Sequence, residues 1–312
     1  MPESLHQAHP SGGGCRPHGP RVARVTASQH PLTSLQDLPG VREGVDAARE
    51  ACTALRWHEG LRRRTPEAAA ESRVRGAAAS ALLEGAEPAG SEGSVDLVRD
   101  LVRGAVPWSA REHDPLWRVL AGVVRATVAT EHQGPRQLGA PAQVLASLHT
   151  AAASELLPPG QLGRPRTVDE DCREWTELGP PPPAGEAAER LRMVQDLLRS
   201  ASAGGVPTLL VAAVVHAELV AARPFVLGNG VVARALERIV LRAGGLDPTG
   251  VAVPEVGHAD RAGTDYRGAM SAYVSGDPEG VRLWLLHCAQ AVERAAAEGA
   301  RIADAVRAGR LS

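Results

Sequence analysis

The chain contains no lysine, and only one phenylalanine and two tyrosines occur among its 312 residues. Because aromatic residues make up only 3% of the chain, few side chains are available for stacking on unpaired bases. The formal net charge is −2, so no overall positive field attracts the protein to nucleic acid or to acidic lipid. We therefore expect neither nucleic acid nor a membrane among its partners.

The four cysteines show no pattern of metal binding or disulfide pairing. Cys15, Cys52, Cys172 and Cys288 form no CxxC pair and lie in different contexts, which predicts neither a zinc site nor a disulfide framework. The first residues do not combine a basic start with an apolar core. No run of about 18 apolar residues is free of charge. We therefore expect a cytoplasmic protein with reduced thiols.

Helical periodicity recurs along the chain. Hydrophobic residues make up 44% of the sequence, enough for a core that must consist mainly of Ala, Leu and Val. Val45, Ala48, Cys52 and Leu55 are spaced by three and four residues, as on one face of an amphipathic helix. The same reasoning predicts helices over residues 116–124, 142–156, 186–203, 207–222, 231–241 and 278–308.

Two segments depart from the helical pattern. Residues 1–34 are rich in Gly, Pro, His and Ser and are predicted to be a disordered tail, with histidines spaced too irregularly for a metal site. Residues 164–175 are the only segment that we expect to be extended, as part of one short hairpin. The predicted fold class is therefore mainly α.

The most informative segment is residues 223–234, which read RPFVLGNGVVAR. Gly228, Asn229 and Gly230 stand directly before an apolar helical run. Glycines there allow positive φ, so that successive N–H groups can point into one concavity at the positive end of a helix. The segment therefore predicts a phosphate-binding turn.

The same twelve residues resemble the core motif of the Fic (Fido) family, His-x-Phe-x-Asp/Glu-Gly-Asn-Gly-Arg-x-x-Arg. The positions that match are Phe225, Gly228, Asn229, Gly230 and Arg234. The family typically transfers AMP from ATP to a protein hydroxyl. The resemblance implies a Fic/Fido-type helical bundle with a short β-hairpin flap, and it assigns Arg234 and the three motif residues 228–230 to nucleotide or phosphate binding.

Three departures from the motif affect the chemistry that the resemblance implies. Arg223 replaces the family's histidine, and a guanidinium has no lone pair with which to accept a proton. Leu227 replaces the acidic residue that holds Mg²⁺, and its side chain offers no oxygen ligand. Val231 replaces the first arginine, which removes charge stabilisation from phosphoryl transfer. We therefore predict no confident catalytic residue and no metal site.

His216 is a remote candidate for a substitute base, because it lies seven residues, or two helical turns, before Arg223. The alternative interpretation is a buried structural histidine. Arg223 itself is predicted to add a second cation to the phosphate pocket and partly to replace Mg²⁺.

A second motif lies far upstream. Ser80, Glu84 and Gly85 fit the family's inhibitory-helix signature, Ser/Thr-x-x-x-Glu-Gly/Asn. The resemblance implies that Glu84 reaches Arg234 and blocks productive ATP binding. The alternative is that residues 80–84 are simply a helix end with Gly85 as its C-cap.

The resemblance spans residues 80–292 and suggests three parts: a tail (1–34), an N-terminal helical region with the inhibitory-type helix (35–110), and a Fic/Fido-like helical domain with C-terminal helices (111–312). The flap over residues 164–175 is expected to dock a protein target by strand pairing.

These observations predict a degenerate Fic-domain protein with a residual nucleotide or phosphate pocket, little or no AMP transfer, and a regulatory or protein-binding role. ATP or ADP is the expected ligand, and Mg²⁺ is not expected. The first alternative is an active adenylyltransferase restrained by Glu84. A remote alternative is a dinucleotide-binding oxidoreductase, because residues 228–233 fit a loosened G-x-G-x-x-A fingerprint with Asp247 near the ribose-binding offset.

Overall fold

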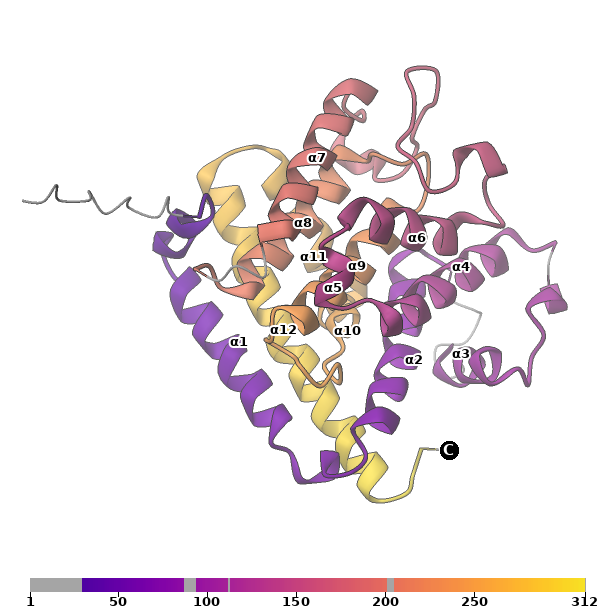
Figure 1. The fold of residues 1–312 in the computed structure, drawn as a ribbon, viewed down its shortest axis with the longest axis vertical. Helices are drawn as coiled ribbons and strands as arrows, with labels where there is room; N and C mark the ends of the chain where they lie inside the picture. The colour runs from indigo at the N-terminus through magenta and orange to yellow at the C-terminus, as the bar shows by residue number, and fades with distance from the viewer. Residues whose placement is uncertain (1–29, 87–93, 112, 201–204, 312) are drawn as a thin grey trace, which may run out of the picture.

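The computed structural model describes residues 30–86, 94–111, 113–200 and 205–311. Across these ranges the chain forms helices joined by loops and short 3-10 turns, and no strand occurs in them (Figure 1). The helices are α1 (Val41–Arg56), α2 (Thr65–Leu83), α3 (Ser94–Arg103), α4 (Pro115–Ala129), α5 (Pro135–Leu138), α6 (Pro141–Ala153), α7 (Ala184–Ser200), α8 (Thr208–Ala222), α9 (Asn229–Ala243), α10 (Pro254–His258), α11 (Thr264–Val274) and α12 (Pro278–Arg307). None of the described helices is both long enough and apolar enough to span a bilayer.

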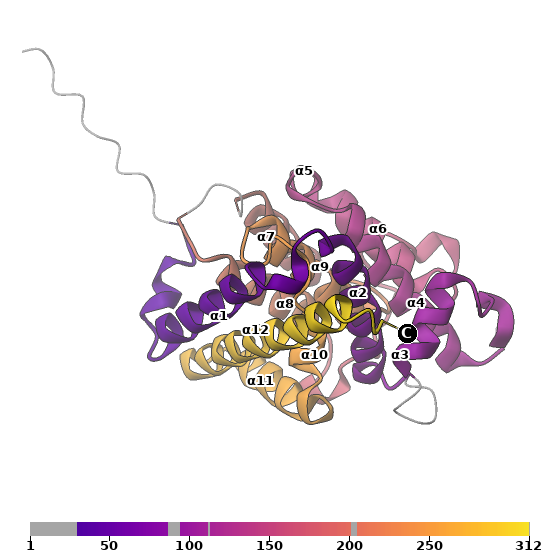
Figure 2. The same cartoon turned by 90° about the horizontal axis from the view of Figure 1, so that it is seen from below.

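Helices α8 and α9 form the centre of the bundle. Nearly every residue of α8 is buried, which agrees with its apolar sequence on all sides. Helix α9 packs directly against α8, and the long helix α12 runs beside α1 along one side of the molecule (Figures 1 and 2). Helices α3 and α4 lie at the other end, over α2. This arrangement places the turn between α8 and α9 deep in the fold.

The predicted mainly helical class is confirmed, and the predicted helices are present with small shifts at their ends. Helix α7 is described as far as Ser200, so the end predicted at residue 203 lies outside the described residues, as do residues 1–29 of the predicted tail. The prediction is wrong for residues 30–34, which form a turn that leads into a 3-10 helix, Thr33–Asp37. The boundary placed at residue 110 stays a prediction. One hydrophobic cluster contains residues of both α1 and α8–α12, so the two expected regions share a core.

The predicted β-hairpin flap is wrong. Residues 164–175 form an irregular segment. One backbone hydrogen bond joins it to the turn after α8, from Arg166 N to Pro224 O (2.8 Å). The side chain of Arg166 instead binds the carbonyls of Arg223 and Pro182. Because prolines lack the N–H that a ladder needs and arginine side chains satisfy the facing carbonyls, no strand pairing develops.

The dinucleotide-binding alternative has no sheet to carry it in the described part of the chain. The fingerprint requires a buried strand before Gly228, whereas residues 208–222 are helical. The carboxylate of Asp247 caps its own turn, accepting hydrogen bonds from Gly250 N (3.1 Å) and Ala252 N (2.9 Å).

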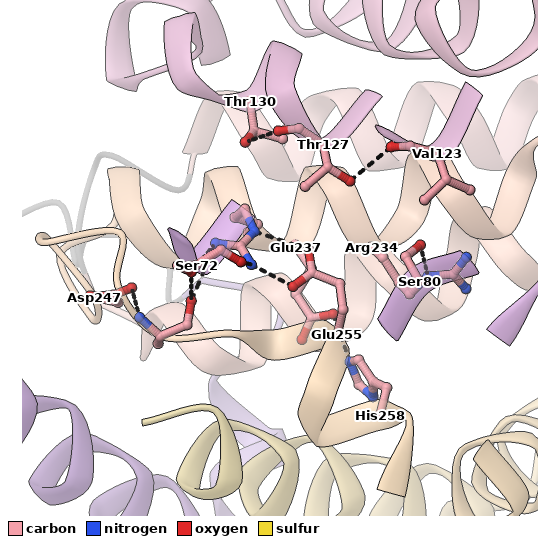
Figure 3. A network of polar contacts seen from close by, with 12 residues as sticks. Ser72, Ser80, Val123, Thr127, Thr130, Arg234, Glu237, Asp247, Glu255 and His258 are labelled. Carbon is pink, nitrogen blue, oxygen red and sulfur yellow. Dashed lines mark hydrogen bonds and ion pairs between the residues drawn. The ribbon is translucent and has the colours of Figure 1, made fainter. Parts of the chain in front are cut away.

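Buried ion pairs tie α9 to its neighbours. The guanidinium of Arg238 makes two contacts with the Glu255 carboxylate (2.9 and 2.5 Å) and donates to Ser72 Oγ (2.9 Å). Both members of the pair are buried. Figure 3 shows Ser72 and Glu255 in this network, with Arg234 beside Ser80 one turn nearer the start of α9. These contacts fix α9 relative to α2 and α10.

We expect Arg238→Met to lower the free energy of unfolding by about 3–5 kcal/mol, because it leaves the Glu255 carboxylate buried without its partner. The double variant with Glu255→Met should lose less, since no charge is then stranded. Urea titration measures both. Arg192→Met, which removes one member of an exposed pair with Glu189, serves as control and should cost less than about 1 kcal/mol. A double variant that is less stable than Arg238→Met would contradict this account.

Candidate functional site

The turn between α8 and α9 is a rigid loop closed by its own polar groups. Helix α8 ends at Arg223, which adopts a left-handed conformation (φ 45°), and Gly228 does the same (φ 87°) before α9 begins. The Asn229 side chain binds the backbone of Phe225 in both directions, at 2.9 Å to its N–H and 3.0 Å to its carbonyl. The loop therefore presents the first N–H groups of α9 in a fixed direction.

His149 on α6 supports this loop from behind. Its Nδ1 accepts a hydrogen bond from Gly163 N (2.9 Å), so Nε2 carries the proton and donates to Leu227 O (3.0 Å). The ring also stacks on Phe225, with centroids 4.1 Å apart. Burial lowers the pKa of His149 to about 4, so the ring is neutral at pH 7. Sequence reasoning missed this residue because a lone histidine in an apolar helix carries no motif.

Glu174 occupies the anion-binding turn. Its carboxylate accepts hydrogen bonds from Gly228 N (2.6 Å), Asn229 N (2.9 Å) and Asn229 Nδ2 (2.7 Å). Burial, and then the charge of Glu84, raise the pKa of Glu174 to about 7. We call these three donors the cradle. The residue that fills it was also missed, because nothing in the spacing of Glu174 indicates that it reaches α9.

Glu84 and Ser80 meet Arg234 beside the cradle. Arg234 is only 1% exposed; its Nη2 pairs with the Glu84 carboxylate, and its Nε donates to Ser80 Oγ (2.9 Å). Glu84 is the C-cap of α2, and Gly85, which was predicted to be the cap, follows it with φ +68°. The two interpretations of this motif are therefore compatible, since the helix end delivers Glu84 to Arg234.

The space above Gly230 is where the polar groups converge. A Cβ atom added to Gly230 would lie 2.8 Å from Glu84 Oε1, and 3.2 Å from both Arg234 Nη1 and Trp175 Nε1. Arg234 Nη1 is buried and has no hydrogen-bond partner among the described residues. A larger residue here would have to push the Glu84 carboxylate aside. The Tyr266 hydroxyl lies beside the same guanidinium, so a ligand that reached Nη1 would contact both groups.

Arg223 points away from the cradle. Its side chain is 2% exposed and donates to four carbonyls of one loop: Glu174 O (3.4 Å), Trp175 O (3.2 Å), Gly179 O (2.8 Å) and Pro180 O (2.9 Å). The structure therefore does not bring Arg223 together with Arg234, and the role of a second phosphate-binding cation requires these bonds to break.

His216 lies in a closed polar cluster under the site. Its ring nitrogens contact Glu237 Oε2 (2.6 Å) and Tyr266 OH (2.7 Å), and His258 Nε2 contacts the same Glu237 oxygen (2.8 Å). Figure 3 shows His258 beneath Glu237. Burial lowers the pKa of His216 to about 4. His216 is thus a buried, neutral histidine with both nitrogens occupied, held by side-chain partners.

The donor sets in the site do not fit metal ions. One candidate atom each from His216, Glu237 and His258 lie within 4.8 Å of one another, but the 2.6 and 2.8 Å contacts are hydrogen-bond lengths. Ligands that share a tetrahedral zinc ion lie about 3.3 Å apart. At the family's Mg²⁺ position Leu227 offers only its carbonyl, which already accepts from His149. Both oxygens of Glu174 are held by N–H donors.

Comparisons with known proteins agree with the geometry. Residues 140–241 match the model of the Fic/DOC family. A Fic family protein from Desulfovibrio desulfuricans has a similar structure, with a TM-score of 0.58 and 19% identity, covering 82% of this chain and 73% of that one. Fic-1 from C. elegans (aa134–508) matches with a TM-score of 0.60 and 19% identity, covering 89% and 75%. No curated protein sequence matches the chain. At these identities the structural likeness shows the fold alone.

We expect the free energy of unfolding to fall as the pH drops from 7 to 5. Burial lowers the pKa values of His149 and His216 to about 4, whereas an unfolded histidine protonates near 6.5. At each of these histidines the unfolded chain therefore binds more protons in this window, so stability present above pH 6.5 is lost toward pH 4. Glu174, whose pKa is raised to about 7, acts in the opposite direction, but the two histidines together outweigh this one carboxyl group.

Urea titrations at several pH values test this dependence. His149→Gln should show a shallower fall than wild type, whereas His132→Gln, which alters an exposed histidine, should follow the wild-type curve. Parallel curves for His149→Gln and wild type would show that this ring does not carry the effect.

Proposed function

We propose that the chain is a Fic-domain protein that weakly binds the phosphates of ATP or ADP at the start of α9 and transfers little or no AMP. The match of residues 140–241 to the Fic/DOC family model supports the first part of this proposal. The observation that carries this proposal is the cradle itself. Gly228 and Asn229 already bind a buried oxyanion, the carboxylate of Glu174, through three donors. A phosphate oxygen needs the same donors at the same helix end.

Arg234 supports phosphate binding beside the cradle. Its Nη1 is buried without a partner and lies 3.2 Å from the Cβ position over Gly230, one residue along α9 from the cradle. A diphosphate that reaches the cradle would have a cationic donor for its second phosphate. Glu84 and Glu174 both repel such a ligand, so weak affinity is expected until they move.

Neither of the two candidate bases, Arg223 and His216, suits transfer chemistry. Arg223 cannot accept a proton, and its guanidinium is engaged with loop carbonyls. His216 is fully buried, and its two nitrogens are occupied by Glu237 and Tyr266. Neither candidate is positioned to receive a proton from a target hydroxyl.

A regulatory or protein-binding role is the second part of the proposal. In the segment 164–175, Val168 is 86% exposed and is flanked by Thr167 and Asp169 in sequence. An exposed apolar side chain on an irregular segment offers a contact to a protein partner. Strand pairing is not the mode proposed for it, because this segment is not a strand.

Calorimetric titration with ADP and ATP tests nucleotide binding. We expect weak heat from wild type at millimolar nucleotide and tighter binding by Glu84→Gly, since the partner that neutralises Arg234 is gone. Arg234→Met should bind less than wild type, whereas Arg192→Met on the surface of α7 should not differ from it. Absence of binding by both wild type and Glu84→Gly would leave only the protein-binding role.

Incubation with labelled ATP, alone and with lysate, tests the transfer reaction. We expect no labelled protein from wild type or from Glu84→Gly, because removing Glu84 supplies no base and no Mg²⁺ ligand. Labelling that depends on Glu84→Gly would show instead that the contact with Arg234 restrains a working adenylyltransferase.

A further inference from the structure

The loop over residues 174–180 is fixed by two sets of contacts, one made by the Glu174 carboxylate and one by the Arg223 guanidinium. In the first set, Glu174 places its carboxylate into the cradle. In the second, Arg223 donates to the carbonyls of Trp175, Gly179 and Pro180. The loop therefore closes over the start of α9 through one anion and one cation.

The backbone of the two residues that meet here, Trp175 and Arg223, is unusual. Trp175 and Arg223 both have positive φ, at 54° and 45°, although neither is glycine. Such residues persist only where surrounding contacts hold them, and they cluster at functional sites. Here the Arg223 guanidinium bonds the Trp175 carbonyl itself, so each unusual residue holds the other in place.

The closed site holds two carboxylates, Glu174 and Glu84, close enough to repel each other. Glu84 is paired with the guanidinium of Arg234, whereas Glu174 is held by uncharged N–H donors and lies close enough to Glu84 for that charge to raise its pKa. Arg234 Nη1 remains buried without a partner. Two neighbouring carboxylates repel each other, and a buried N–H group without an acceptor is unfavourable. A ligand that displaces Glu174 and reaches Arg234 Nη1 would relieve both.

We propose that Glu174 is the resident oxyanion of the cradle and that the loop over residues 174–180 is an internal lid held by Arg223, which a phosphate ligand must displace. This inference rests on the proposed nucleotide binding. It adds which residues close the binding site and which anions can enter it. Glu174 decides which anions enter, because only an oxyanion that outcompetes a tethered carboxylate is bound. Arg223 is a positioning residue that acts on the ligand through the loop.

Arg223 thus has a structural role in the loop, although it stands at the position of the family's catalytic histidine. The family's histidine faces the reaction, whereas this arginine binds the loop that closes the site. Removing Arg223 should therefore increase ligand affinity, and an increase is not what general damage to the fold would produce.

The test measures ADP and inorganic pyrophosphate binding by calorimetry for wild type, Glu174→Ala and Arg223→Gln. We expect each variant to bind ADP at least about tenfold more tightly than wild type, because the competing carboxylate is removed or its loop is released. Asp169→Asn, which neutralises an exposed carboxylate on the preceding segment, should bind as wild type does. Amide hydrogen exchange at residues 228 and 229 without ligand should be faster in Glu174→Ala, which reports the vacated cradle independently of binding.

Glu84→Gly separates the two proposals. If Glu84→Gly binds ADP more tightly while Glu174→Ala matches wild type in both affinity and amide exchange, the lid is wrong and the nucleotide site stands. If no variant binds, including the double variant Glu84→Gly/Glu174→Ala, the proposed function is wrong and the lid falls with it.

Discussion

The first N–H groups of α9 are buried at the positive end of a helix and need an acceptor, and this requirement organises the site. Glu174 meets it with both carboxylate oxygens. Since Glu174 belongs to an irregular loop, the loop must be held, and Arg223 holds it through four carbonyls. On the other side of Gly230, Glu84 and Ser80 occupy two edges of Arg234. The site is thus closed by its own side chains.

The three departures from the family motif have structural consequences that fit one another. Arg223 binds the loop that carries Glu174. Leu227 keeps a useful carbonyl, which accepts from His149 and fixes the turn. Val231 is buried in the hydrophobic cluster with α2 and α4, where an arginine would need a partner. Together these residues favour a closed, stable site over an open catalytic one.

Local sequence patterns predicted most of the fold, but they did not predict the residues that close the site. Helical periodicity predicted α1, α8 and α12 because the apolar pattern of each helix lies within its own sequence. Resemblance to a motif brought Glu84 and Arg234 together across 150 residues. Glu174 and His149 were missed, since each meets the turn only after folding, across 54 and 78 residues. The expected hairpin failed because side chains and prolines replaced the ladder in the segment 164–175.

Mapping the ADP site by amide chemical shifts tests the central claim most directly, because it locates a bound phosphate without requiring turnover. When ADP is added to Glu174→Ala, the account predicts the largest shifts at the amides of Gly228, Asn229 and Gly230. When ADP is added to the wild-type protein, the amides of the loop over residues 174–180 should shift as well, because the ligand displaces the loop. Saturable binding of ADP that leaves the start of α9 unperturbed would contradict the claim.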